Sequence, residues 1–288
     1  MKASQIWRWE KGGRPRRWPD ELAREEPLEI RVDNRAVAVT MRTPGHDEEL
    51  AAGFLVSEGL IHRREQVVNT SPHPRNADRN VIGVFLADGV RIDFQRLARH
   101  TFVSSSCGLC GKTSIESVRR QFPPIRSPVR VQAETLLALP DTLRRGQTAF
   151  ARTGGLHAAG LFDLDGNLLL LREDIGRHNA VDKVLGRGFL DGRLPFDRHI
   201  LVVSGRASFE IMQKALAGRL PIVVAVSAPS SLAVEFAKSS RQTLAGFVRG
   251  DRMNIYSGYK RIIFPNHPAR AASAKVSVAA DVRRRIPG

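Results

Sequence analysis

The sequence predicts an α/β protein in which helices cover a parallel or mixed sheet, with a smaller β-rich lobe at the N-terminal side. In the second half, short apolar runs alternate with segments of helical periodicity, an order typical of strand–helix–strand units. In the first third, apolar and polar residues alternate on either side of short turns, which is typical of paired strands.

Short local patterns predict the elements of the N-terminal third. Residues 1–19 combine tryptophans, glycines and arginines and are expected to form a loosely held basic arm. Alternation across residues 27–41 predicts a hairpin that turns at residues 33–34. An acidic run at 47–49, followed by an apolar stripe, predicts a helix that ends at Gly59.

The segments that lead to the two cysteines of the chain are less regular. Residues 63–80 are rich in Arg, Asn, Pro and Ser and are expected to form a loop. Residues 81–94 are expected to form a second hairpin with its turn at Gly89, and residues 95–112 a further loop. Apolar residues at helical spacing predict a helix over 113–122.

The second half is patterned more strongly. Helices are expected over residues 132–145, 178–187, 206–218 and 229–240, and strands over 156–163, 167–172, 199–203, 221–226, 244–248 and 253–256. Pro140 is expected to interrupt the first of these helices, and Pro229 to lie in the first turn of the last. The chain then divides into a basic arm (1–19), an N-terminal lobe with the cysteine loop (20–128), an α/β lobe (129–264) and a basic tail (265–288).

Composition and charge narrow the class of protein. The 288 residues are 42% hydrophobic, which is typical of a folded chain. The formal net charge of +16 is concentrated at the two ends, so nucleic-acid binding is not expected to be the main function. A positive surface also suits a nucleotide-like anion or an acidic protein partner. No apolar run approaches the length of a membrane span and no secretory signal is visible, so a cytoplasmic location is expected.

Cys107 and Cys110 are the only cysteines, and they form a single Cys-x-x-Cys beside Lys112. The expected helix beyond them would offer unpaired backbone N–H groups, and these together with the lysine charge favour thiolate. Three chemistries fit such a pair: a zinc site completed by histidines such as His157 and His178, thioredoxin-like dithiol exchange, and persulfide carriage. Two buried, inert thiols are the fourth interpretation.

Four polar turns between expected elements could hold a ligand: residues 153–157, 172–179, 204–208 and 248–253. Turns that follow strands and feed helices are the usual ligand positions in α/β sheets. In the second turn, Asp174 could orient His178, His178 could bind an anion at the helix start, or Asp174 could simply cap the helix. In the third, Arg206 could meet a phosphate. The fourth reads, from spacing alone, as a simple hairpin turn with exposed charges.

These motifs together resemble the FdhD family, the formate dehydrogenase accessory sulfurtransferases. The matching stretches are Ser-Cys-Gly-Leu-Cys-Gly at 106–111, Thr-Gly-Gly-Leu-His at 153–157, Glu-Asp-Ile-Gly-Arg-His-Asn-Ala-Val-Asp-Lys at 173–183, Ser-Gly-Arg-Ala-Ser-Phe-Glu at 204–210, Ala-Val-Ser-Ala-Pro-Ser-Ser-Leu-Ala-Val-Glu at 225–235 and Gly-Phe-Val-Arg at 246–249. They occur in the family's order over about residues 20–264, and both basic ends lie outside the resemblance.

The resemblance implies a cytidine-deaminase-like fold and a sulfurtransferase that relays sulfur. A cysteine desulfurase would supply persulfide sulfur, and the protein would pass it to the molybdenum bis(molybdopterin guanine dinucleotide) cofactor, Mo-bis-MGD, for formate dehydrogenase. Cys107 matches the persulfide cysteine of the family and Cys110 its partner. The segment that contacts the cofactor is matched by Val248, Arg249, Gly250, Asp251, Arg252 and Met253. The protein is expected to form a homodimer and to bind no metal of its own.

Two other classes of function compete with the sulfur carrier. A non-catalytic chaperone could bind and insert the molybdenum cofactor, with the cysteines serving a structural role. Nucleic-acid binding through the basic ends would make association strongly dependent on salt.

Overall fold

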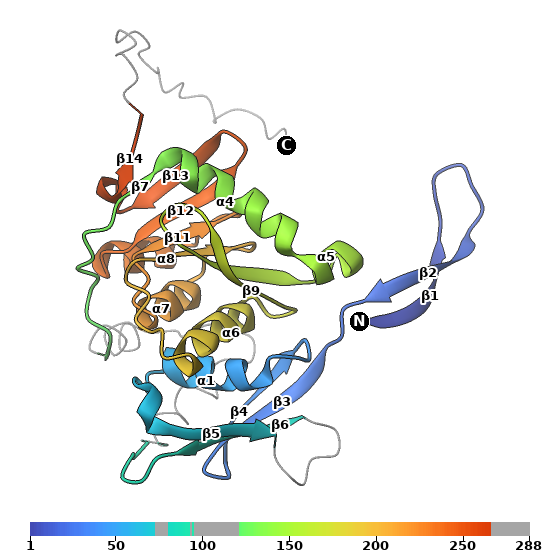
Figure 1. The fold of residues 1–288 in the computed structure, drawn as a ribbon. Coiled ribbons are helices and arrows are strands. Elements are labelled where there is room, and N and C mark those ends of the chain that lie inside the picture. The colour runs from blue at the N-terminus through green and yellow to red at the C-terminus, as the bar shows by residue number, and fades with distance from the viewer. Residues whose placement is uncertain (73–79, 93, 95–120, 266–288) are drawn as a thin grey trace, which may run out of the picture.

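The computed structural model describes residues 1–72, 80–92, 94 and 121–265. Both cysteines, most of the helix expected over 113–122 and nearly all of the C-terminal tail lie outside the described residues. The α/β fold with a smaller β-rich lobe at the N-terminal side is confirmed (Figure 1).

A six-stranded mixed sheet forms the centre of the larger part. Its strands are β8 (His157–Phe162), β9 (Leu168–Asp174), β10 (Ile200–Val203), β11 (Ile222–Ala225), β12 (Thr243–Arg249) and β13 (Arg252–Ser257), in the order β13-β12-β11-β10-β8-β9. Strands β10, β11 and β12 run parallel. Strand β8 runs antiparallel to β10 and to β9, and β13 antiparallel to β12. The apolar runs expected to be strands therefore pair as one sheet.

Helices cover both faces of this sheet because successive strand residues point to opposite sides. On one face, Leu201, Val203 and Val223 pack with residues of α6 (Arg177–Leu190), α7 (Phe209–Ala217) and α8 (Ser231–Ser239). On the other face, Val202 and Val224 pack against α4 (Ala133–Gly146). The short helix α5 (Thr148–Thr153) follows α4. The paired strands β7 (Val131–Gln132) and β14 (Ile262–Ile263) lie at the start of α4.

The N-terminal lobe is a four-stranded sheet with one helix packed on it. Its strands are β3 (Glu26–Val32), β4 (Arg35–Arg42), β5 (Val67–Pro72) and β6 (Val81–Leu86), in the order β4-β3-β6-β5, and its helix is α1 (Asp47–Ser57). A short 3-10 turn, η1 (Arg64–Gln66), precedes β5. The buried side of α1, including Leu50 and Leu55, packs on Leu28, Ile30 and Val32 of β3.

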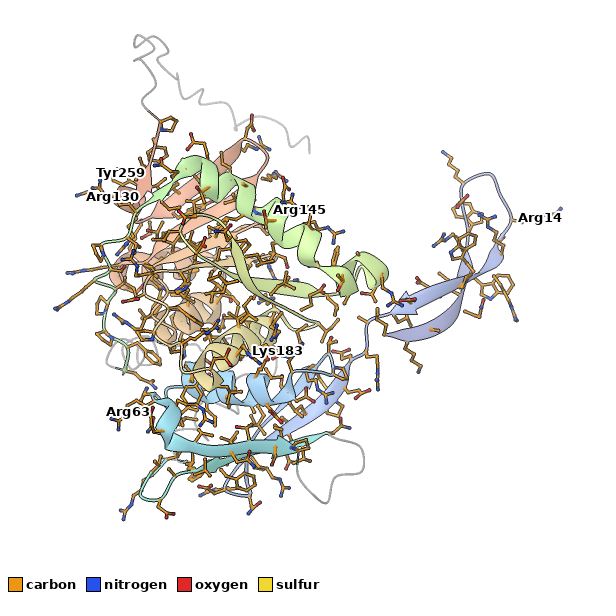
Figure 2. All side chains as sticks on the ribbon, in the orientation of Figure 1. Arg14, Arg63, Arg130, Arg145, Lys183 and Tyr259 are labelled. Carbon is orange, nitrogen blue, oxygen red and sulfur yellow. The ribbon has the colours of Figure 1, made fainter. Side chains whose placement is uncertain are left out.

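Helices α1 and α6 cross at two glycines and join the two sheets into stacked layers (Figure 1). A Cβ added to Gly53 would lie 1.8 Å from the Asp182 carbonyl oxygen, and one added to Gly186 would lie 1.7 Å from that of Glu49. The two backbones therefore meet with no room for a side chain. Buried ion pairs surround this crossing, among them Lys183 with Asp174 at 2.7 Å, and Lys183 lies between the layers in Figure 2.

Two predictions in the N-terminal third were wrong. Residues 63–80 are not simply a loop, because Val67–Pro72 form β5, with Val67 and Thr70 turned inward. Residues 81–94 are not a hairpin, because β6 pairs with β5 and β3 instead of a following strand. The 1–19 segment also forms more structure than a loose arm: β1 (Lys2–Arg8) pairs with β2 (Arg16–Leu22) as a hairpin.

Helix boundaries in the second half differ from expectation at three points. Helix α4 continues through Pro140. Helix α7 starts later than residue 206 because Ala207 forms an isolated parallel bridge with Pro229. Ala207 donates to the Ala228 carbonyl at 3.2 Å, and Ser230 donates to the Ala207 carbonyl at 3.0 Å. The same pairing keeps Pro229 out of α8, whose first turn is capped by the Ser230 hydroxyl.

Candidate functional site

Strand direction brings all four polar turns of the second half to one edge of the six-stranded sheet. Parallel strands β10, β11 and β12 end there. Because β8 is antiparallel to both of its neighbours, its first residue, His157, and the last residue of β9, Asp174, reach the same edge and pair with each other. The sequence placed each turn beside a strand, and the topology gathers them.

The turn after β10 packs tightly against the start of β8. The Ser204 hydroxyl accepts a hydrogen bond from the Ala158 N–H at 2.9 Å, which fixes the turn to the strand. A Cβ on Gly205 would lie 3.2 Å from Nδ1 of His157 and 3.8 Å from the side chain of Arg177. Glycine at this position therefore lets the turn approach the imidazole closely.

His157 and His178 lie among cations and are held in the neutral form. Burial lowers the pKa of His157, and the positive charges of Arg177 and Arg206 lower it further. Burial, with Lys214 and Arg177, lowers the pKa of His178 to about 4. Both imidazoles are therefore neutral near pH 7 and can donate or accept hydrogen bonds.

His178 faces the start of α7. Its Nε2 lies 3.2 Å from the Ser208 hydroxyl oxygen and 3.9 Å from Oε2 of Glu210. Although burial alone would raise the pKa of Glu210, hydrogen bonds from Ser208 and the backbone, with the charges nearby, lower it. The ionised Glu210 therefore acts on His178 through the Ser208 hydroxyl, which lies between them.

Arg177 has capacity to bind a further group. Its Nε is buried, and within the described residues it has no hydrogen-bond partner. A buried donor without an acceptor is costly and rare in folded proteins. Since Arg177 and Arg206 both act on His157, an anion at this edge would meet a guanidinium donor and a second positive charge.

Asp174 plays a structural part and does not orient His178. Its carboxylate is fully buried, pairs with Lys183 at 2.7 Å and accepts hydrogen bonds from the backbone N–H groups of Thr43 and Gly176 and the side-chain amide of Asn179. The expectation that Asp174 caps the helix was wrong as well, because the N-cap of α6 is Gly176 and, within the described residues, no side chain caps this helix end. The hydrogen bonds that Asp174 accepts also tie Thr43, directly after β4, to α6, which a sequence pattern could not reveal.

The segment 248–253 forms the turn between β12 and β13 at the same edge. Arg249 pairs with Arg252 across the turn, and residues 249–252 are exposed. Within the described residues neither guanidinium has an ion-pair partner. Val248 is fully buried in the core and Met253 packs against it, so the side chains available to a ligand here are those of the turn itself.

Phe247, directly before this turn, is strained. It holds a φ of 53°, a conformation unusual for a bulky residue, and donates its N–H to the Ser227 carbonyl at 3.2 Å. The β12–β13 pairing shifts register between Gly246 and Arg249. Strained backbone of this kind concentrates at ligand-binding positions.

Sequence reasoning missed Lys214 and Asp182. They form a buried ion pair at 2.8 Å and share the Ser57 hydroxyl, so one cluster joins α1, α6 and α7. The available signal was a charged residue on the inward face of each expected helix, Asp182 next to Val181 and Lys214 next to Ala215.

Neither a metal site nor a membrane-spanning helix occurs among the residues that the structure describes. Across residues 1–72, 80–92, 94 and 121–265, no group of three or more His, Cys, Asp or Glu side chains could hold a metal ion. Among the helices of the described residues, none is both long and apolar enough to cross a membrane. Cys107 and Cys110 lie outside the described residues, so their prediction stays untested.

Together, the fold and this edge define an α/β protein that gathers arginine and histidine side chains where strands turn into helices, an arrangement suited to an anionic ligand. A family model described as the FdhD/NarQ family matches residues 23–263. The chain belongs to the FdhD/NarQ family, which confirms the resemblance noted in its motifs.

Individual relatives agree with this assignment. The chain is 52% identical over 254 residues to the sulfur carrier protein FdhD of Mycobacterium tuberculosis, covering 85% of this chain and 92% of the relative. It is 49% identical over 265 residues to the sulfur carrier protein FdhD of Streptomyces avermitilis, covering 89% and 92%. A crystal structure of a protein from Desulfotalea psychrophila, described as a formate dehydrogenase accessory protein, matches with a TM-score of 0.73 and 25% identity over 91% of this chain and 99% of that one.

Proposed function

We propose that this protein is a sulfur carrier that takes persulfide sulfur from a cysteine desulfurase and transfers it to Mo-bis-MGD for formate dehydrogenase. The observation that carries the proposal is the 52% identity to a sulfur carrier protein FdhD over most of both chains. The single Cys-x-x-Cys at 107–110 provides the thiols that such a reaction needs. A cationic sheet edge provides donors for the phosphates of the cofactor.

In the first step, the Cys107 thiolate attacks the terminal sulfur of the desulfurase persulfide. A new S–S bond forms on Cys107, the S–S bond of the donor breaks, and the donor cysteine leaves as a thiolate. The transferred sulfur keeps its oxidation level, so this step needs no external oxidant or reductant.

The second step delivers sulfur to the cofactor as sulfide, which requires two electrons. The Cys110 thiolate supplies them by attacking the Cys107 sulfur of the persulfide. A Cys107–Cys110 disulfide forms, the persulfide S–S bond breaks and hydrosulfide leaves towards the metal. A dithiol reductant then restores both thiols.

The described residues fit a large anionic substrate at the edge of the six-stranded sheet. The buried Nε of Arg177 needs an acceptor, and a phosphate oxygen is one. Arg249 and Arg252, exposed on the β12–β13 turn, could pair with the pyrophosphate groups of the cofactor. With strands about 4.8 Å apart, the turn and the histidine cluster are separated by roughly 15 Å, a span that a dinucleotide-sized ligand can bridge.

Mass spectrometry tests the carrier role. After incubation with a cysteine desulfurase and cysteine, the purified protein should gain the mass of one sulfur, lose it on treatment with a thiol reductant, and fail to gain it when Cys107 is replaced by Ala. Cys107→Ala protein that still activates formate dehydrogenase normally in cells would overturn the mechanism. Such a result would favour the alternative function, a cofactor-binding chaperone in which the cysteines are structural.

A further inference from the structure

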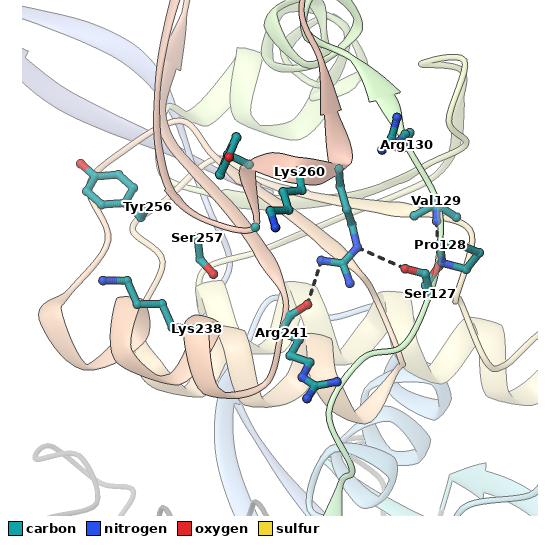
Figure 3. Close-up of a pocket in the computed structure, with 12 residues that line it drawn as sticks. Ser127, Pro128, Val129, Arg130, Lys238, Arg241, Tyr256, Ser257 and Lys260 are labelled. Atoms are coloured by element: carbon teal, nitrogen blue, oxygen red, sulfur yellow. Dashed lines mark hydrogen bonds between the residues drawn. The ribbon is translucent and has the colours of Figure 1, made fainter.

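A second cationic site lies at the opposite edge of the six-stranded sheet. Here the end of β13 pairs with the start of β12, Ser257 opposite Leu244, far from the strand ends that form the first site. An open depression of about 680 Å³ is lined by residues 127–130, Lys238, Arg241 and residues 256–261 (Figure 3). The 3-10 turn η2 (Tyr259–Arg261) forms part of its wall.

The charge of this depression is all of one sign. Its lining contains five basic residues and no acidic one: Arg130, Lys238, Arg241, Lys260 and Arg261. Arg261 is used internally, because its guanidinium donates to the carbonyls of Arg241 at 2.8 Å and of Ser127 at 3.4 Å. The other four form no ion pair with any described residue, and Figure 3 shows them around the depression. In the part of the chain that the structure describes, these four cations therefore have no ionic partner.

Arg241 occupies a position where glycine is the favoured residue. It follows helix α8 with a φ of 58°, and the next residue, Gln242, donates back to the Ala237 carbonyl at 2.9 Å, which is the usual glycine-terminated helix end. Arg219 holds the same position after α7, and its guanidinium donates to the carbonyls of Pro123 and Pro124. The Arg241 guanidinium, by contrast, has no hydrogen-bond partner within the described residues. Among these residues, no contact of the side chain therefore accounts for an arginine at this strained position.

The four cations other than Arg261 are not needed to satisfy the carbonyls at the end of α8 either. Arg241 N–H donates to the Lys238 carbonyl, and Ser240 N–H to that of Phe236. The Ser240 carbonyl accepts from the Ile125 N–H at 2.8 Å. Internal backbone donors therefore already satisfy these three carbonyls, and the side-chain charges remain available to an external ligand.

We propose that this depression binds an acidic segment of a partner protein. The nearest helix, α8, presents its C-terminal end, where the helix dipole disfavours a compact phosphate group. Carboxylates spaced along an extended chain can instead reach cations that project from separate elements. Tyr256 and Tyr259 add aromatic surface beside the charges, which suits a polypeptide. A partner seated here leaves the opposite edge, with its arginine and histidine cluster, uncovered.

Fluorescence anisotropy with a fluorescein-labelled oligoglutamate peptide tests this directly on the full-length protein. Replacing Lys238 and Arg241 together by Glu should weaken binding about tenfold or more, since two attractive charges become repulsive. A matched control replaces Arg14 and Arg145 by Glu, which changes the net charge equally but far from Arg130 and Tyr259 (Figure 2). The control should bind within about twofold of the unaltered protein at physiological salt, where charges beyond the Debye length are screened.

Arg241→Gly separates binding from folding. Glycine relieves the left-handed backbone, so the variant should melt at a higher temperature while binding the peptide more weakly. Unchanged peptide affinity in both Arg241→Gly and the Lys238/Arg241 double variant would overturn the proposal. So would binding of inorganic pyrophosphate or labelled oligouridylate at this depression in preference to the peptide. Peptide binding needs no sulfur donor, so its failure is distinguishable from a failure of sulfur transfer.

Discussion

Replacing Lys214 by Met should destabilise the protein strongly, because it leaves the Asp182 carboxylate buried without its counter-ion. The two groups lie 2.8 Å apart between α6 and α7, and both are almost inaccessible to solvent. Removing one partner of a buried ion pair costs about 3–5 kcal/mol. Burial already raises the pKa of Asp182 against the opposing effect of Lys214, so the carboxyl of the variant should take up a proton and recover part of that loss.

The double variant Asp182→Leu/Lys214→Met is the matched comparison. Replacing both charges leaves no buried polar group without a partner, because the Ser57 hydroxyl keeps its hydrogen bond to the Phe54 carbonyl at 3.1 Å. The loss of unfolding free energy should therefore stay within about 1 kcal/mol. Urea unfolding with linear extrapolation measures both variants. The reasoning is refuted if the single variant loses less than about 1 kcal/mol, or if the double variant loses as much as the single one.

The Lys214→Met variant also reports on the histidine cluster. Burial is the main cause of the low pKa of His178, about 4, and the Lys214 charge is the next. Removing that charge should raise the pKa of His178 towards its ordinary value near 6.5. An NMR titration of the imidazole would show the shift, and an unchanged pKa would mean that Lys214 does not act on the site.

Three further outcomes follow from the same contacts. Gly53→Ala should cost more than about 3 kcal/mol in urea unfolding, since the new Cβ would lie 1.8 Å from the Asp182 carbonyl oxygen; a cost below about 1 kcal/mol would contradict the close crossing of α1 and α6. Because the folded pKa of His178 is about 4 and the unfolded one near 6.5, the unfolded state binds more protons between these values. The unfolding free energy should therefore fall as pH drops from about 6.5 to about 4, and His178→Gln should flatten that slope; equal slopes would contradict the assignment. Arg249→Gln and Arg252→Gln should each weaken pyrophosphate binding about three- to tenfold in calorimetry while leaving the melting temperature unchanged, and undiminished binding in both would exclude the turn as a phosphate contact.

The larger sheet could be predicted because its strands are short, uninterrupted apolar runs. Ile200–Val203 and Ile222–Ala225 are fully buried on both faces, so every residue carries the signal, and the helices between them show clear apolar stripes. Strand β5 gave little signal, because only Val67 and Thr70 of Val67–Pro72 are buried and the rest is polar or exposed. A strand with two inward residues cannot be told from a loop by periodicity.

The candidate site was predicted in its parts but not in its assembly. The spacing of the motifs placed His157, His178 and Arg206 beside turns. His157 reaches the same edge as His178 and Arg206 only because β8 runs antiparallel to β10. The roles of Asp174 and Lys214 depend on partners that are distant in the sequence. Asp174 accepts a hydrogen bond from Thr43, and Lys214 of α7 pairs with Asp182 of α6. Long-range pairing of this kind leaves no local pattern in a single sequence.

Transfer of radiolabelled sulfur from cysteine to the molybdenum cofactor tests the central claim most directly. The protein would be incubated with a cysteine desulfurase and radiolabelled cysteine, separated from both, and then mixed with Mo-bis-MGD. The sulfur carrier account predicts label on the protein first and on the cofactor afterwards, with no label on either when Cys107 is replaced by Ala. Label that reaches the cofactor equally well through Cys107→Ala protein would contradict it.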